Sequence, residues 1–175
     1  MHKQLMTDTS LDSLMALLDS KDVMVRQKAR ISLVAMGKRS VSALSRVLQH
    51  SSSAHARWAS AKALSEICDV GSIPALIGAL EDTDSDVAWL AALALQKMKK
   101  EAWRLLLQKL IDKGEDSVRL RRGVYHVFTN QHDTGFNDLL GELRDSLEDT
   151  APPESWSLIA EKILKRIRSE QGDEV

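Results

Sequence analysis

A pair of residues that recurs every 31 positions is the feature that most limits what this chain can fold into. The pair begins with Val or Ala, and Arg follows in three of its four copies. The copies are Val25-Arg26, Ala56-Arg57, Val87-Ala88 and Val118-Arg119. A polar segment precedes each copy, and a helical pattern of about twelve residues follows it. A fixed period of this length is typical of a chain built by stacking one small structural unit.

The residues around each pair recur as well. The polar segments carry matching residues at two positions, which are Asp19 and Asp22, His50 and Ser53, Glu81 and Asp84, and Asp112 and Glu115. Eight residues after the start of the pair, the first three copies have Leu33, Leu64 and Leu95, whereas the fourth has His126. A second helical pattern precedes each polar segment, at residues 10–19, 40–49, 72–81 and 102–112. Each copy therefore predicts a helix A, a short turn and a helix B.

This pattern predicts an all-α fold, a right-handed α-solenoid of about five helix pairs in a single domain spanning residues 1–175. One pair cannot bury its apolar stripe alone, so neighbouring pairs must stack. The expected repeats cover residues 10–37, 38–70, 71–99, 100–130 and 134–169, and a disordered tail follows over residues 170–175. In the last repeat we expect residues 136–149 to form the fifth helix A and residues 155–170 to close the array as a charged amphipathic helix.

Composition excludes several classes of protein. The 24 basic and 25 acidic residues give a net charge of -1, unlike the strongly positive field of a dedicated nucleic-acid binder. The lone Cys68 excludes an internal disulfide, and we interpret it as a small buried thiol in a reducing compartment, with a reactive thiol as the alternative. The N-terminus lacks the pattern of a signal peptide, and the longest apolar run, residues 87–95, is too short to span a bilayer. We expect a cytoplasmic monomer without a membrane segment.

Three segments carry an acidic hinge, then the recurring pair, then an Ala-rich helix B with a leucine near its end: "DSKDVMVRQKARISLVAMG", "AHARWASAKALSEI" and "EDTDSDVAWLAALALQKM". In this respect residues 10–130 resemble the HEAT-repeat superfamily, in particular its short-repeat branch related to the phycobilisome-lyase repeats. The resemblance implies that hinge acids and helix-B arginines pair from one repeat to the next. It assigns this role to Asp22, Arg26, Arg57, Asp84 and Arg119, and Ala88 departs from it.

Trp58 and Trp89 occupy the same position in consecutive repeats and are the first candidates for a binding site. One interpretation is an aromatic platform for a partner side chain, a base or a planar chromophore. The other is packing between repeats, where the two rings fill space left by small alanines. We expect both rings at the edge of the face formed by the B helices, which lines the concave surface of such arrays.

Two further features lie between residues 97 and 128. Nine basic residues fall within residues 97–122 against four acidic ones, which predicts either a patch for phosphate or an acidic protein, or a solvated helical face. Tyr125 and His126 could act as a proton-transfer or ligand pair, or His126 could be a packed histidine with a backbone partner. Arg119 and Arg122 join Tyr125 as candidate binding residues.

The sequence favours a binding protein over an enzyme. It lacks HExxH, GxGxxG, GxxxxGK[ST] and GxSxG, and a single cysteine cannot form a zinc cluster. DNA-alkylation glycosylases of similar architecture need a carboxylate near their concave aromatics, but Lys62 and Leu93 stand one turn after the two tryptophans. We therefore expect no catalytic residue, no metal and no cofactor, and no role in nucleic-acid repair.

Our prediction is a non-catalytic scaffold that binds another protein in the groove lined by the B helices. The candidate binding residues are Trp58, Trp89, Lys62, Arg119, Arg122 and Tyr125. Two alternatives stay open. The family resemblance alone implies lyase-like or chaperone-like handling of a tetrapyrrole, which is the only enzymatic alternative. The basic segment 97–122 implies weak binding of a nucleic-acid backbone.

Overall fold

The computed structural model describes residues 11–148, 153–170 and 172, and within them the regular structure is entirely helical. This confirms the predicted all-α class. The chain divides into two compact units, residues 1–97 and residues 98–175. The predicted tail lies outside the described residues except for residue 170, which ends a helix, and residue 172.

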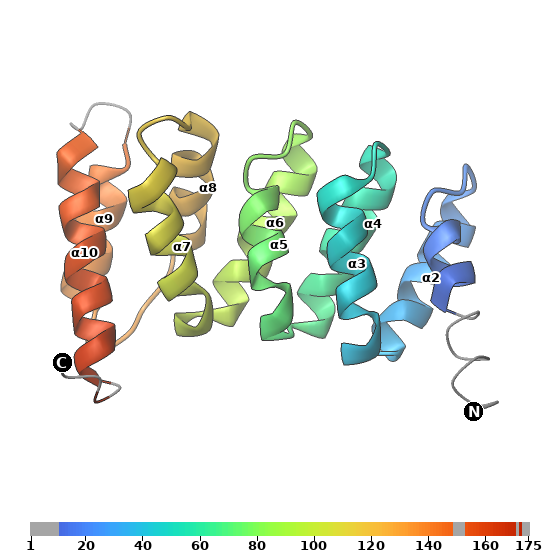
Figure 1. Ribbon diagram of the computed structural model, residues 1–175, viewed down its shortest axis with the longest axis horizontal. Helices are drawn as coiled ribbons and strands as arrows, with labels where there is room; N and C mark the ends of the chain where they lie inside the picture. The colour runs from blue at the N-terminus through green and yellow to red at the C-terminus, as the bar shows by residue number, and fades with distance from the viewer. Residues whose placement is uncertain (1–10, 149–152, 171, 173–175) are drawn as a thin grey trace. The chain divides into compact units, whose positions relative to one another are not determined.

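Residues 1–97 form stacked helix pairs (Figure 1). After a first helix that ends at residue 17, the unit contains α2 (Val23–Ala35), α3 (Lys38–His50), α4 (Ala54–Ile67), α5 (Ile73–Ala79) and α6 (Ser85–Met98), with a short 3-10 helix, η1 (Val70–Ser72), before α5. The A helix α3 packs against its partner α4 and against the next A helix, α5, while the B helix α2 packs against α4. The layers of A and B helices are those of an α-solenoid of HEAT-like repeats.

Each B helix of this unit begins at a polar residue whose side chain accepts a backbone hydrogen bond. Asp22 accepts from the amide of Met24 at 2.8 Å, and Ser53 accepts from the amide of Ala56 at 3.3 Å. Asp84 accepts from the amide of Val87 at 3.2 Å. These are N-caps, which satisfy amides that have no partner within the helix. The 31-residue period therefore marks the start of each B helix.

The fourth repeat departs from this period by two residues. Its B helix, α8 (Val118–Phe128), is capped by Ser117, whose hydroxyl accepts from the amide of Leu120 at 3.1 Å, and not by Glu115 as the period implies. The start of the preceding helix, α7 (Lys100–Lys113), keeps the period of α3, but two more residues lie between that start and the cap of α8 than between the start of α3 and the cap of α4. In the corrected register, the buried Phe128 takes the place of Leu64, so the apolar series that His126 interrupts in the sequence continues.

An arginine four residues after the N-cap ties the turn to the B helix. The Nη1 atoms of Arg26 and Arg57 donate to the carbonyls of Ser20 and Ser51 at 2.6 and 2.9 Å. Arg121 donates in the same way to Gly114 at 2.5 Å, so Arg121 takes the place that the sequence assigned to Arg119. That assignment is wrong for the same reason as the register of the fourth repeat.

The predicted pairing between repeats is present at Arg57, but its partner is Asp82. Nε of Arg57 donates to Oδ2 of Asp82 at 2.7 Å, and Nη2 donates to Oδ1 at 2.9 Å. These hydrogen bonds raise the pKa of Arg57. Asp84 was expected to be the partner, but its carboxylate caps α6, and Asp22 likewise caps α2. A bidentate pair between largely buried groups fixes the second repeat against the third.

Residues 98–175 contain α7, α8, α9 (Asn137–Ser146) and α10 (Pro153–Glu170). We expected α9 to be the fifth helix A, and this is wrong. α10 packs against the A helix α7, and α9 packs against the B helix α8 (Figure 1). The start of α7 lies beside the end of α10, where Nζ of Lys100 is 3.1 Å from Oε2 of Glu170, so these two helices are antiparallel. The long connection before α9 allows the chain to enter the last pair from the other layer.

An aromatic cluster forms the core of this unit. The ring of Trp103 lies 5.6 Å from that of Phe128 and 5.7 Å from that of Phe136, measured between centroids. Phe136 is in turn covered by two cations, because Nζ of Lys100 lies 4.4 Å from its ring centroid and the guanidinium of Arg166 lies 5.6 Å from it. The cluster joins α7, α8 and the start of α9 through large rings, whereas close helix packing in residues 1–97 relies on small alanines such as Ala59 and Ala63.

Replacing Asp82 with asparagine tests the pair between repeats. Loss of the carboxylate leaves the guanidinium of Arg57 without its charged partner in a largely buried place, so we expect the free energy of unfolding to fall by about 1–3 kcal/mol. Urea denaturation measures the change. The control is Asp86→Asn, an exposed acid in the first turn of α6, for which the loss should stay below about 1 kcal/mol. Equal losses in the two variants would contradict the role of the pair.

Stability should also depend on pH through Asp138. Its hydrogen bond from Arg166 lowers the pKa of Asp138 from 3.8 in the folded protein. A carboxyl group with a lowered pKa stabilises the fold above its unfolded pKa, and this contribution is lost as pH falls through the folded value. The difference in unfolding free energy between wild type and Asp138→Asn should therefore be present at neutral pH and disappear on acidification below 3.8. An equal difference at neutral pH and below 3.8 would contradict the role of the hydrogen bond between Arg166 and Asp138.

Candidate functional site

Two exposed tryptophans stand out on the B helices of residues 1–97. Trp58 and Trp89 each follow an N-cap by five residues, on α4 and α6, and their exposed fractions are 41% and 55%. Most alanines of α4, such as Ala56 and Ala59, are buried, so these small side chains face the core while the ring of Trp58 faces outward. Neither ring is enclosed by packing between repeats. We call Trp58 and Trp89 together the tryptophan surface.

A pocket adjoins Trp58 between the B helices of the first two repeats. Its volume is about 260 Å³, and we call it the Trp58 pocket. The residues that line it are Val23, Arg26, Gln27, Arg30, His55, Trp58 and Ala59. Val23 and Trp58 are both exposed, so the pocket offers an apolar wall next to cationic groups.

The charges of the Trp58 pocket are not equivalent. Nη1 of Arg30 lies 2.5 Å from Oε1 of Glu66, so this charge is already neutralised by a carboxylate. Arg26 donates instead to two backbone carbonyls, of Ser20 at 2.6 Å and of Lys21 at 3.2 Å. Carbonyls orient a guanidinium but do not cancel its charge. Arg26 therefore carries the excess positive charge of this pocket.

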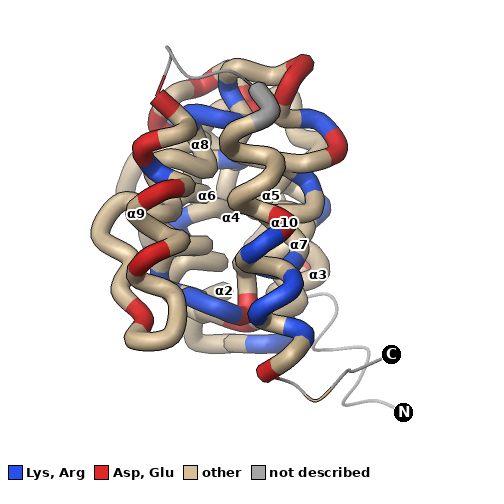
Figure 2. Tube along the Cα trace, turned by 90° about the vertical axis from the view of Figure 1, so that its left-hand side faces the viewer, with Lys and Arg blue, Asp and Glu red and all other residues tan. Residues whose placement is uncertain are grey.

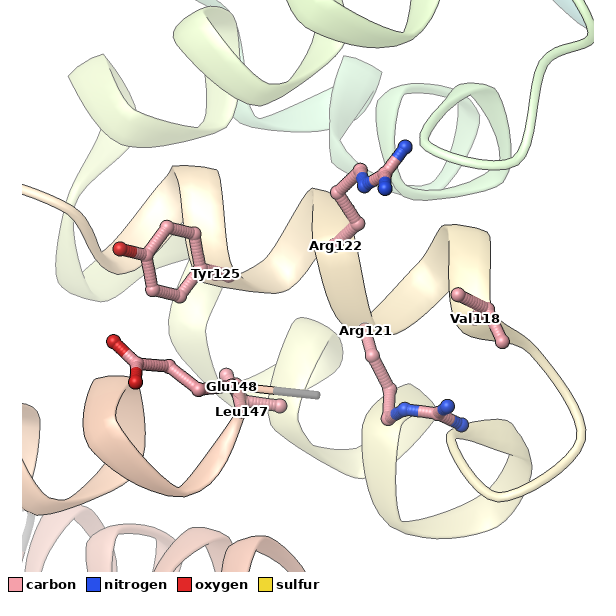
Figure 3. A pocket seen from close by; sticks show the side chains of 6 residues that line it. All are labelled: Val118, Arg121, Arg122, Tyr125, Leu147 and Glu148. Atoms are coloured by element: carbon pink, nitrogen blue, oxygen red, sulfur yellow. The ribbon is translucent and has the colours of Figure 1, made fainter. Parts of the chain in front are cut away.

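A second pocket lies in residues 98–175. Its volume is about 250 Å³, and it is lined by Val118, Arg121, Arg122, Tyr125, Leu147 and Glu148. Figure 3 shows the ring of Tyr125 beside the carboxylate of Glu148, with the guanidinium of Arg122 turned away from that carboxylate. Arg122 and Tyr125 were predicted from the sequence, whereas Leu147 and Glu148 were not, because they directly follow α9, whose layer was predicted wrongly.

The remaining candidates are placed as follows. Lys62 is half-buried on α4, four residues after Trp58 and hence on the same side of the helix. Arg119 is exposed and lines neither pocket. His126 is exposed, so it is not the packed histidine considered from the sequence, and its ring meets that of Tyr125 edge-on at 5.7 Å between centroids. Cys68 is also exposed, in a left-handed conformation at the end of α4, and is not a buried thiol.

The basic segment 97–122 is partly used within the protein. Lys97 donates to the hydroxyl of Ser65 at 3.2 Å, and Lys100 pairs with Asp133 and Glu170 at 3.1 Å each. Arg121 is held by the carbonyl of Gly114. In the same unit, Figure 2 shows acidic positions along α9 and basic positions along α10. These contacts reduce the positive charge that the segment offers to a phosphate backbone.

The described residues form neither a metal-binding cluster nor a membrane span. Within them, no group of three or more His, Cys, Asp or Glu side chains could hold a metal ion. None of the helices formed by these residues is long and apolar enough to cross a membrane.

The stacked helix pairs, the capped B helices and the Arg57–Asp82 pair between repeats define a helical-repeat protein. Residues 41–126 match the family model described as HEAT repeats, and the chain belongs to the HEAT-repeat superfamily. Repeats of this family generally mediate protein–protein interaction and are generally not enzymes. The assignment to the short-repeat branch stays a prediction. The comparison with curated proteins finds no match.

The environments of the four tryptophans give a direct test of the exposed surface. Trp103 and Trp156 are only 1% and 4% exposed, in contrast to the tryptophan surface. A Trp58→Phe, Trp89→Phe double variant should therefore lose most of the emission that acrylamide quenches and should emit at shorter wavelength. Circular dichroism should stay unchanged. Strong quenching of the remaining emission would contradict the exposure assigned to Trp58 and Trp89.

Proposed function

We propose that this protein is a non-catalytic scaffold that binds another protein through the tryptophan surface. The observation that supports this most strongly is the exposure of two tryptophans at one repeat position on neighbouring B helices. Tryptophan is among the residues most enriched in the energetic centres of protein interfaces, and leaving two such rings in water is unfavourable. A partner that covers them recovers this free energy.

The rigidity of the surface favours the same function. Both rings stand on helices whose starts are fixed by N-caps, and the second repeat is tied to the third by the Arg57–Asp82 pair. A surface that is ordered before binding loses little conformational entropy when the partner arrives. Lys62, one turn after Trp58, would contribute a polar contact at its edge.

The size of the Trp58 pocket weighs against a tetrapyrrole. At about 260 Å³ it lies below the roughly 300–1,000 Å³ of pockets that enclose drug-sized ligands, and a tetrapyrrole is larger than most of these. One or two side chains of a partner would fit. We propose a second contact region formed by Arg119, Arg122 and Tyr125, of which Arg122 and Tyr125 line the same pocket. We also propose that the protein acts in the cytoplasm.

Replacing both tryptophans with alanine tests the proposal. Each ring removed from the centre of an interface is expected to weaken binding by roughly 30-fold or more, so the double variant should fail to retain a partner. The measurement is affinity capture from a lysate of the source cells, followed by mass spectrometry and an absorption spectrum of the eluate, and then titration of the purified partner.

The matched control is Leu105→Ala with Leu158→Ala, which removes two exposed apolar side chains from residues 98–175. This control should keep the partner. Equal capture by the tryptophan double variant and by wild type would contradict the proposed surface. A visible-absorbing ligand in the eluate would instead support handling of a tetrapyrrole.

A further inference from the structure

We infer that the Trp58 pocket receives an acidic side chain of the partner protein, whose carboxylate pairs with Arg26 while a neighbouring apolar side chain packs on Trp58. This inference rests on the proposed function and adds the chemistry of the partner. It is carried by a comparison between two equivalent arginines, Arg26 and Arg57, of which only Arg57 has a carboxylate partner.

Arg57 shows what this position in the repeat binds. One edge of its guanidinium, Nη1, donates to the carbonyls of Ser51 and Ser52 at the preceding turn, at 2.9 and 3.2 Å. Its other edge, Nε with Nη2, holds both oxygens of Asp82. Asp82 stands two residues before the N-cap of the next repeat, and its Oδ1 also accepts from the amide of Asp84 at 2.8 Å. The guanidinium of Arg57 thus binds both the backbone of the turn before its own helix and a carboxylate of the turn in the next repeat.

Arg26 has the first half of this arrangement and lacks the second. Its Nη1 donates to the carbonyls of Ser20 and Lys21, as Arg57 does one repeat later. The residue equivalent to Asp82 is Ser51, whose hydroxyl accepts from the amide of Ser53 at 3.2 Å in the same way. A hydroxyl there completes the turn but supplies no negative charge. Among the described residues, no carboxylate forms an ion pair with Arg26.

The surroundings of Arg26 favour a carboxylate from outside. The described lining of the Trp58 pocket contains Arg26, Arg30 and His55 but no acidic residue. Glu66 neutralises Arg30, and the nearby Asp19 accepts a hydrogen bond from Ser53. A half-buried guanidinium next to an apolar wall binds a carboxylate more strongly than one in open water does, because the local dielectric is lower.

The same surroundings favour a protein segment over a nucleic acid. An arginine beside an exposed tryptophan could hold a phosphate and stack a base. The turns on both sides, however, carry the acids Asp19, Asp22 and Asp84, which repel a continuous phosphate backbone. A partner segment that carries one carboxylate next to an apolar residue complements this pocket, in which Arg26 is the unneutralised cation and Val23 and Trp58 form the apolar wall.

Two peptide-display libraries test this inference with the full chain. They are identical except that one contains Asp and Glu and the other has Asn and Gln in their place. Peptides should be enriched from the acidic library, with an acid close to a large apolar residue. Arg26→Met, which keeps the apolar stem, should weaken the selected peptides by roughly tenfold or more in fluorescence anisotropy. Arg39→Met, an exposed arginine of α3, is the matched control and should leave binding unchanged.

Ser51→Asp provides a variant that cannot be confused with unfolding. It should rebuild the pair seen at Arg57 and Asp82, so that an internal carboxylate occupies Arg26. Peptide binding should then fall by a similar factor, while the midpoint of urea unfolding stays the same or rises. Unchanged binding in both Arg26→Met and Ser51→Asp would overturn the inference, as would equal enrichment from the neutral library or Arg26-dependent competition by a single-stranded oligonucleotide.

These outcomes separate the inference from the proposed function. Binding that is lost in Trp58→Ala with Trp89→Ala but is insensitive to Arg26→Met would overturn the role of Arg26 and leave the tryptophan surface standing. Binding that is insensitive to both sets of changes would overturn both.

Discussion

The hydrogen bonds that a polar side chain accepts at the start of each B helix set the register of everything that follows along it. Asp22, Ser53 and Asp84 accept from backbone amides that would otherwise lack a partner, so the helix begins at the next residue and at no other. Once the start is fixed, the helical period decides which later residue faces the core. Leu33, Leu64 and Leu95, each 11 residues after its cap, are all fully buried.

The same period separates the two features that carry the candidate function. Neighbouring residues on a helix point about 100° apart, so the side chains of the fourth and fifth residues after a cap face in different directions and contact different surroundings. In the second repeat, Arg57 reaches its own turn and Asp82, whereas Trp58 faces outward. An arginine that stabilises the stack and a tryptophan that is free to bind can therefore be adjacent in sequence without competing for space.

The sequence predicted the part of the fold that one repeat dictates, and it failed where the repeats differ. A spacing of 31 residues was enough to align the two tryptophans and the three polar residues that cap the B helices in the structure, although the capping role itself was not predicted. The partner of Arg57 could not be chosen in the same way, since Asp82 and Asp84 are both acids of one turn and only the cap at Asp84 decides between them. The fourth repeat was misplaced by two residues because the two extra residues between the start of α7 and the cap of α8 change the count and leave no local signal.

The reversed order of α9 and α10 shares this cause. The apolar periodicity of a helix indicates that it has a buried face but not which layer it joins, and here the contacts of α10 with α7 decide it. The pocket that brings Arg122 and Tyr125 together with Leu147 and Glu148 depends on that reversal, so only its α8 side could be expected. The exposure of Trp58 and Trp89 could likewise not be predicted from the sequence, because the sequence was compatible with both an enclosed ring and an exposed ring.

On the proposed binding of a partner's carboxylate to Arg26, Ser51 and Asp82 illustrate how a repeat array can convert a stabilising contact into a binding site. Both residues accept a hydrogen bond from the amide two residues later, so the turn is formed equally well by a hydroxyl and by a carboxylate. Only the carboxylate closes the pair with the arginine of the preceding repeat. The first and second repeats are therefore joined without an ion pair at this position, at some cost in stability, and Arg26 remains available beside Trp58. Arg57 has a carboxylate partner within the chain, whereas the equivalent Arg26 has none among the described residues. A stabilising contact that is missing in one repeat and present in the next is a physical sign of a binding site, because a group from a partner can restore it.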